Sequence, residues 1–290
     1  MLHSFDAAVE RLATLDAKWL AVALGLQLAN LAFRATAWRN VLRAAYPGKR
    51  IRLVEVGAAY AAGVAANAYT PARAGEAVKV ALLRLRLHGT SLPTIAASSS
   101  VILVFDAFIG GTLLVCAWAL GVVPALPHPS PWTVLAAVAA FAFAALLLRI
   151  SSRLRTHLRR GGAILGTPRA YLRGVALPQL GAWSCRLGVA FAMLAAFGLP
   201  ATLPLAAIVV VAGGLSTLVP ATPGGAGTQQ LLVVYVLHSV VSAASALSFA
   251  IGMQVGVTLV NTLVGLAGLA LLLGTLRPAA VRAALRGARL

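Results

Sequence analysis

The sequence predicts an all-α integral membrane protein with about seven to nine hydrophobic helices, because stretches of roughly 20 apolar residues recur along it. The chain of 290 residues is 60% hydrophobic and only 10% charged, whereas a soluble domain carries roughly 25% charged residues. Its mean hydropathy is +0.91. Basic residues gather in short segments between the apolar stretches, which is the loop pattern of membrane proteins. A water-soluble fold of this size could not cover its surface with so few charges.

The charge balance indicates contact with membrane lipids. The net charge is +18, from 24 Lys and Arg against 6 Asp and Glu. In a soluble protein such an excess would suggest nucleic acid, but here the basic segments follow the positive-inside pattern. We therefore expect an anionic or phosphate-bearing lipid as the partner, and no nucleic acid.

Neither a metal site nor a cofactor site is expected, and we do not expect an enzyme. Cys116 and Cys185 lie far apart in apolar stretches, and the five histidines are scattered singly. No acidic residue follows Asp106, so paired-carboxylate catalysis is excluded from the rest of the chain. Glu76 and Asp106 are the only plausible buried acids for a membrane-embedded lipid-modifying enzyme, which is the less favoured alternative.

The first elements are a surface helix and a span. Residues 4–17 have the pattern of a short amphipathic helix lying on the membrane. Residues 19–42 form the first span, which opens at Trp19, a typical interface anchor. Arg34 and Arg39 fall in its last third, from where long basic side chains reach the nearby interface.

The first helical break follows an apolar segment. Residues 53–69 are rich in Ala and Gly, and residues 70–76 (TPARAGE) interrupt the helical pattern. A short helix to about Leu87 is too polar to face lipid. Residues 93–122 are a long span that contains Asp106.

The second half repeats this order of elements. A span at 132–148 and a basic loop at 149–173 precede it. Its elements are a span at 174–198, an apolar segment at 204–219, a break at 222–227, a helix to about His238 and a last span at 246–275.

Charge assigns the loops to sides of the membrane. The cytoplasmic segments are expected to be the basic ones, 43–52, 84–88, 149–173 and 277–289. The external segments are expected to be those without Lys or Arg, 123–131, 199–203 and 239–245. The N-terminus then lies outside and the C-terminus inside.

An internal repeat is predicted within a single membrane domain, 1–290. Both breaks read Thr-Pro-x-x-Ala-Gly, at 70–75 and 222–227. The half-repeats are about 19–122 and 174–275, joined by the extra span 132–148 and the basic loop 149–173. One extra crossing inverts the second half, so we expect two re-entrant helical hairpins whose tips approach each other near the midplane. The alternative is a chance match in a chain rich in Ala and Gly.

The first tip favours an anion. A proline at a helix start leaves unpaired N–H groups and the positive end of the dipole at the break. Arg73 and Lys79 add positive charge, and Gly75 allows close approach to the backbone. Glu76 stands three residues from both cations, so the structural alternative is a local ion-pair network.

The second tip offers bare backbone and neutral hydrogen-bonding groups. Gly224, Gly225 and Gly227 expose the backbone, and Gln229 and Gln230 supply amides. Between the two tips we expect a site for a phosphate-bearing headgroup. Asp106 either belongs to this site or pairs with a buried arginine, Arg34 or Arg39.

These motifs resemble those of a known family. N-x-x-x-P-x-R-x-G-E is present as Asn67, Pro71, Arg73, Gly75 and Glu76. P-G-G-x-G is present as Pro223, Gly224, Gly225 and Gly227. Together with the span bearing Asp106, they resemble the lysylphosphatidylglycerol synthase transmembrane-region family, also called the flippase-like domain family, over nearly the whole chain.

The resemblance implies a multi-pass protein of a bacterial or archaeal cytoplasmic membrane that moves a charged phospholipid between leaflets. The best-known members also carry a C-terminal aminoacyl-transferase domain, and this chain stops about a dozen residues after its last span, so we expect no such activity. Some relatives that consist of this region alone are linked to hopanoid or glycolipid pathways. The family often has Glu where Gln230 stands, which makes an amine-bearing substrate less expected.

The leading hypothesis is therefore a lipid flippase or transporter. An accessory subunit of a lipid pathway, docking through the basic loop 149–173, is the alternative, and a lipid-modifying enzyme is a third.

Overall fold

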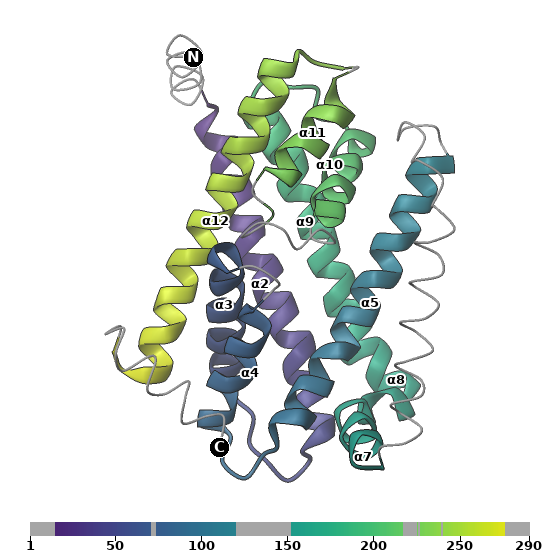
Figure 1. Ribbon diagram of the computed structural model, residues 1–290, viewed down its shortest axis with the longest axis vertical. Coiled ribbons are helices and arrows are strands. Elements are labelled where there is room, and N and C mark those ends of the chain that lie inside the picture. The colour runs from purple at the N-terminus through teal and green to yellow at the C-terminus, as the bar shows by residue number, and fades with distance from the viewer. Residues whose placement is uncertain are drawn as a thin grey trace.

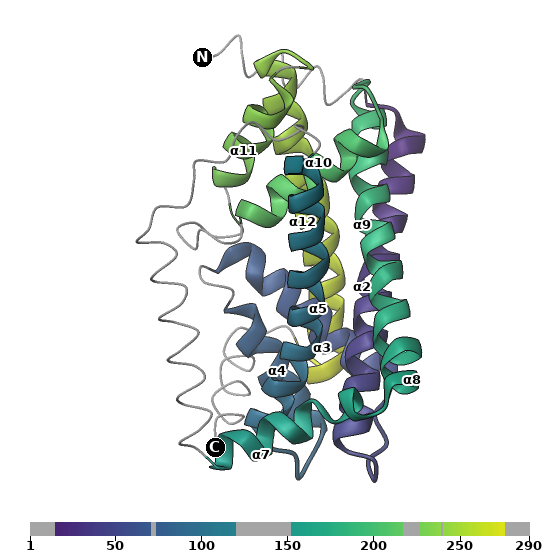
Figure 2. The ribbon, with the colours of Figure 1, turned by 90° about the vertical axis from the view of Figure 1, so that its right-hand side faces the viewer.

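A computed structural model describes residues 15–70, 74–119, 152–216, 225, 227–238 and 240–275. The described residues form helices without β-strands, as predicted. Four long helices run along the molecule, and two pairs of shorter helices fill the space beside them (Figures 1 and 2). The long helices are α2 (Ala17–Ala45), α5 (Leu92–Ala119), α9 (Leu177–Ala196) and α12 (Ala243–Leu273). The shorter pairs are α3 (Leu53–Tyr69) with α4 (Gly75–Arg86), and α10 (Leu203–Ser216) with α11 (Thr228–Leu237).

The predicted elements of both halves are found close to their expected ends. The predicted span 19–42 is α2, which begins where the Asp16 carboxylate accepts a hydrogen bond of 2.9 Å from the Lys18 N–H. Three described helices are long and apolar enough to cross a membrane: α2, α5 over Leu92–Cys116, and α12. The predicted elements 4–17, 132–148 and 277–289 lie wholly or almost wholly outside the described residues.

Glycines on α12 allow its close packing against α3. A Cβ on Gly268 would lie 2.6 Å from the Ala58 carbonyl oxygen, and one on Gly265 would lie 2.3 Å from the Ala65 Cβ. Small residues on both helices therefore let the two backbones approach each other, as is common between helices in membranes. The other extensive helix pair is α2 with α9.

The two short pairs lie in opposite halves of the molecule. In both views α3 and α4 occupy the lower half, and α10 and α11 occupy the upper half (Figures 1 and 2). The longer helix of each pair has 17 and 14 residues, or about 26 and 21 Å at 1.5 Å per residue. Both are shorter than the hydrocarbon core of roughly 30 Å.

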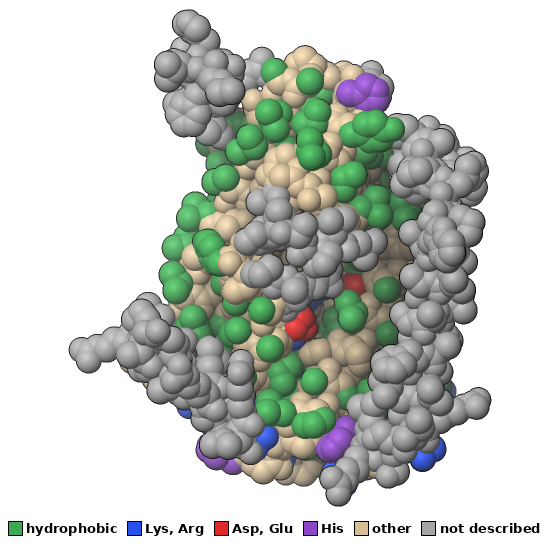
Figure 3. Space-filling model, viewed as in Figure 1, with side chains coloured by type: hydrophobic (Ala, Val, Ile, Leu, Met, Phe, Trp, Pro, Cys, Tyr) green, Lys and Arg blue, Asp and Glu red, His purple; other side chains and the backbone are tan. Residues whose placement is uncertain are grey.

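The described basic segments, 43–52, 84–88 and 152–173, gather at one end of the molecule (Figures 1 and 2). At this lower end the Lys49 ammonium donates a hydrogen bond to the His88 carbonyl oxygen. The Asn40 side chain donates one of 2.9 Å to the Gly174 carbonyl oxygen. Figure 3 shows Lys and Arg side chains at the lower end and acidic side chains near the middle of the face.

The prediction of a loop at 149–173 is wrong for the described part of this segment, which is helical. It contains α7 (Ser152–Gly161), a 3-10 turn (Ala163–Gly166), α8 (Pro168–Tyr171) and the start of a π-helical turn (Leu172–Ala176). Packing against α5 orders α7: the His157 Nδ1 lies 2.9 Å from the Thr94 hydroxyl, and a Cβ on Gly161 would lie 2.6 Å from the Ala97 Cβ. The high charge of this segment indicated a loop. The contacts that order it as a helix come from α5, which lies far away in sequence, so the local charge pattern does not record them.

Candidate functional site

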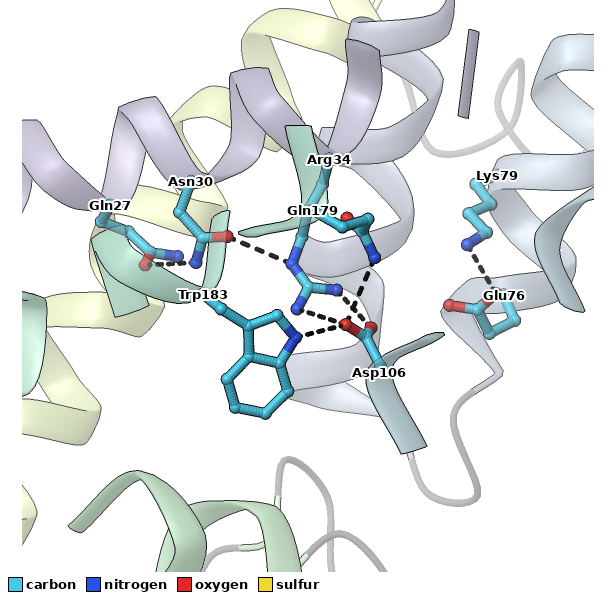
Figure 4. A network of polar contacts seen from close by, with 8 residues as sticks. All are labelled: Gln27, Asn30, Arg34, Glu76, Lys79, Asp106, Gln179 and Trp183. Carbon is cyan, nitrogen blue, oxygen red and sulfur yellow. Dashed lines mark hydrogen bonds and ion pairs between the residues drawn. The ribbon is translucent and has the colours of Figure 1, made fainter. Parts of the chain in front are cut away.

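A buried ion pair joins α2 to α5 (Figure 4). The Arg34 guanidinium donates two hydrogen bonds to the Asp106 carboxylate, of 2.6 Å from Nη1 and 3.1 Å from Nη2. The two side chains are only 12% and 21% exposed. Of the two arginines that the sequence left open as partners of Asp106, Arg34 forms the pair. Arg39 instead donates to the Ile51 carbonyl oxygen at 3.0 Å.

Two residues of α9 complete the shell around Asp106. Its Oδ1 accepts hydrogen bonds from the Trp183 indole at 2.9 Å and from the Gln179 amide at 3.3 Å. The carboxylate thus accepts four hydrogen bonds, two of them from a fixed positive charge.

A chain of amides extends this network to α12. The Arg34 Nε donates to the Asn30 side-chain oxygen at 3.1 Å. The Asn30 amide donates to Gln27 at 3.4 Å, and the Gln27 amide donates to Asn261 at 2.8 Å. One connected set of polar contacts therefore joins the four long helices. Each contact pairs polar groups that would have no hydrogen-bond partner if they faced lipid.

A second site surrounds the ammonium of Lys79 on α4. Its Nζ lies 2.6 Å from the Glu76 carboxylate and 5.0 and 5.1 Å from the ring centroids of Trp38 and Tyr60. Lys79 is 6% exposed, whereas the Glu76 side chain is 50% exposed. Two aromatic faces therefore stabilise the buried cation, and its only carboxylate contact among the described residues faces outward.

The spacing of Asn67 and Gly75 in the first motif has a local explanation at the first tip. The Gly75 N–H, the first of α4, donates a hydrogen bond of 2.8 Å to the Asn67 side-chain oxygen. A Cβ on Gly75 would lie 2.0 Å from the Gly63 carbonyl oxygen. Asn67 therefore caps α4 from the end of α3, and Gly75 allows the two helices to meet.

This cap differs from the tip that the sequence predicts. The expectation was a helix starting at Pro71 with unpaired N–H groups, but α4 begins at Gly75 and its first N–H is taken by Asn67. The sequence pattern missed the cap because the acceptor belongs to the preceding helix.

The second tip is closed by a glutamine. The Gly227 N–H donates a hydrogen bond of 2.6 Å to the Gln230 side-chain oxygen, and the Gln230 amide donates to Gln254 on α12. Gly225 and Gly227 have φ values of +72° and +86°, a region that favours glycine. Gln230 is thus used to hold the start of α11 against α12.

The predicted site residues that the structure describes fall into four groups. Asn67 lies with Gly75, Glu76 lies with Lys79, Gly227 lies with Gln230, and Asp106 belongs to the network of the long helices. Gly225 lies against Ser216 at the end of α10. Pro71, Arg73, Pro223 and Gly224 lie outside the described residues.

Sequence reasoning missed most of the polar network. Gln27, Asn30, Arg34 and Trp38 follow one another at spacings of three and four, which places them on one face of α2. This polar stripe inside an apolar span was the available signal. The partners on α9 and α12 had no comparable signal.

The fold and these contacts define an α-helical membrane protein with a charged network inside its helical bundle. A family model, described as the lysylphosphatidylglycerol synthase TM region, matches residues 2–265. The chain therefore belongs to this family. No curated protein matches it.

Proposed function

We propose that the protein is a lipid flippase of the bacterial or archaeal cytoplasmic membrane, which moves a phospholipid or lipid-linked headgroup between leaflets. Its family membership is compatible with a lipid-related role. The observation that carries the proposal is the placement of two pairs of short helices, α3 with α4 and α10 with α11, in opposite halves of the molecule (Figures 1 and 2). This placement supports the predicted re-entrant hairpins. In transporters built as inverted repeats, such broken elements form the substrate site near the midplane.

The buried cation of Lys79 supports a phosphate-bearing substrate. Charges inside a membrane domain are costly and are usually functional. Because Glu76 is half-exposed, its carboxylate can leave the Lys79 ammonium when a phosphate arrives, while Trp38 and Tyr60 keep the ammonium in place. In this mechanism Arg73 adds a second charge, the lipid tails stay in the bilayer, and the tips are exposed to each side in turn.

The alternative roles require features that the contacts do not favour. A lipid-modifying enzyme needs an available acid or base, but Asp106 accepts four hydrogen bonds and Glu76 is paired with Lys79. An accessory subunit would act through its basic end and would not require Lys79.

The test is leaflet exchange in liposomes that contain the purified protein. Fluorescent phospholipids with several headgroups are scored by dithionite quenching, for the wild type, Arg73→Ala and Lys79→Gln. We expect protein-dependent exchange that falls at least about tenfold in both variants, the effect of losing a desolvated charge contact. The matched control is Arg155→Gln, which removes one exposed charge from α7.

Each result decides between the hypotheses. If exchange is equal in all variants, the protein is a transporter, but its substrate site does not lie at the first tip. No exchange with phospholipid or glycolipid probes, in liposomes where the protein is folded, would count against transport and favour the accessory role.

A further inference from the structure

We propose that a cavity at the basic end of the molecule, away from the hairpin tips, binds the phosphodiester headgroup of an anionic membrane lipid. The cavity is a groove that is open to the surface, with a volume of about 530 Å³. It is formed between the end of α2 and the segment 163–174. It goes beyond the proposed transport site, because none of the residues predicted at the hairpin tips lines it.

Two arginines give the cavity its charge. Arg43 comes from α2 and Arg173 from the π-helical turn, and both are exposed. Asn40 and Thr167 supply polar groups, and the remaining walls are small or apolar. None of the described residues that line the cavity is acidic. Two guanidinium groups from separate elements, with no carboxylate between them, favour an anion that accepts several hydrogen bonds, such as a phosphodiester.

The backbone around the cavity is held in an unusual form. Leu172–Ala176 is a π-helical turn, and such turns occur frequently at functional sites. The Asn40 amide donates to the Gly174 carbonyl oxygen at 2.9 Å, and a Cβ on Gly174 would lie 3.4 Å from the Asn40 Cβ. This contact fixes Arg173 relative to α2, so that the two arginines face a common space.

The position of the cavity relative to the membrane matches the level of the lipid headgroups. Arg43 lies in the last turn of α2, and the interface residue Trp19 lies near its start. The two positions are 24 steps apart, about 36 Å at 1.5 Å per residue. This is longer than a hydrocarbon core of roughly 30 Å, so α2 can hold both side chains outside the core.

Exposed leucines beside the cavity favour a lipid over a free anion. Leu165 and Leu172 are 56% and 57% exposed, and each is next in sequence to a residue that lines the cavity, Ile164 and Arg173. Leu177, 61% exposed, follows on the same chain segment. Apolar side chains next to a pair of cations suit a ligand with both acyl chains and a charged head, and basic pockets on the cytoplasmic side recognise such lipids.

The experiment measures lipid binding directly. The full chain is placed in detergent micelles, and native mass spectrometry counts adducts of phosphatidylglycerol and phosphatidylcholine. We expect phosphatidylglycerol adducts whose affinity falls about thirtyfold in Arg43→Gln/Arg173→Gln, because two interfacial charges are lost. The matched control Arg155→Gln/Arg159→Gln removes the same charge from exposed positions of α7 at the same end. Arg43→Lys/Arg173→Lys, which keeps the charge, should retain part of the binding.

Three results would overturn the proposal. Equal losses in the site and control variants would indicate general electrostatic attraction. Equal binding of phosphatidylcholine would remove the headgroup specificity. Displacement of the lipid by millimolar inorganic phosphate would assign the cavity to a free anion. Leaflet exchange is not part of the readout, so the proposed transport function can fail while this site stands, and a gel-filtration profile confirms that each variant is folded.

Discussion

The Arg34 guanidinium and the Asp106 carboxylate form a bidentate ion pair, although the two residues are 72 positions apart in sequence. The pair ties α2 to α5, and Trp183 and Gln179 bring α9 to the same carboxylate. Removing either charged partner would leave the other inside the bundle without its counter-charge, which is the costly way to break a buried pair.

Asp106→Asn should therefore destabilise the protein strongly. The expected loss is about 3–5 kcal/mol of unfolding free energy, because Arg34 keeps its charge in a site that is largely shielded from water. Thermal unfolding of the purified protein in detergent measures it. Arg34→Met/Asp106→Leu should be less destabilised than Asp106→Asn, since it leaves no unpaired charge. An Asp106→Asn variant that unfolds at the wild-type temperature would contradict the assigned role of the pair.

Gly75→Ala should weaken the first hairpin. Its new Cβ would lie 2.0 Å from the Gly63 carbonyl oxygen and 2.6 Å from the Asn67 side-chain oxygen, so α3 and α4 must move apart. We expect a loss of about 1–3 kcal/mol, as for other overpacked sites. Gly25→Ala and Gly111→Ala are the controls, because no heavy atom outside the local helix lies within 4 Å of either new Cβ. Unfolding midpoints that are equal for all three would remove the steric argument.

Gln230→Glu tests the departure from the family motif. Gln230 accepts from the Gly227 N–H, and a glutamate could keep this bond while placing a negative charge at the second tip. If the tips hold the headgroup, the new carboxylate should attract the ammonium group of phosphatidylethanolamine. The ratio of the exchange rate of phosphatidylethanolamine to that of phosphatidylglycerol should then rise about fivefold, which corresponds to about 1 kcal/mol of charge attraction. Gln229→Glu, one residue earlier, is the matched control for added charge. An unchanged ratio in Gln230→Glu would separate this position from headgroup selection.

Cysteine labelling tests the membrane orientation that the basic segments predict. Gly48→Cys marks the basic end and Val240→Cys marks the opposite end, and both positions are exposed. The two native cysteines, Cys116 and Cys185, are first replaced by Ala. A membrane-impermeant thiol reagent on intact cells should label Val240→Cys, and should label Gly48→Cys only after permeabilisation. The reverse pattern would show that the basic end faces outward.

The predicted helix positions agree closely with the structure where the pattern is long and apolar. The segment 53–69 is α3 with the same ends, and the helix predicted to about Leu87 ends at Arg86. The break between them was read from Thr70, Pro71 and Gly75, residues whose effect on the backbone is local. The prediction failed at 149–173, where charge indicated a loop and contacts with α5 form α7.

The candidate site was predicted only in part. An ion pair between Glu76 and Lys79 was the structural alternative to an anion site, since the two residues are three apart on a helix, and the structure contains this pair at 2.6 Å. The aromatic rings of Trp38 and Tyr60 around Lys79 were not expected, because each belongs to another helix. The inverted repeat and the re-entrant hairpins stay predictions about how the chain lies in a bilayer.

The sequence by itself determined that this is an α-helical membrane protein, and, to within a few residues, where its long apolar helices begin and end. Hydrophobic length, charge clustering and Pro-Gly breaks act over one helix or less, so they can be read without knowing the fold. Only the tertiary structure decided that Asp106 meets Arg34 and not Arg39, and that Asn67 caps α4. Those contacts depend on which helix faces pack together, and packing is set by the fit of distant surfaces that no local pattern records.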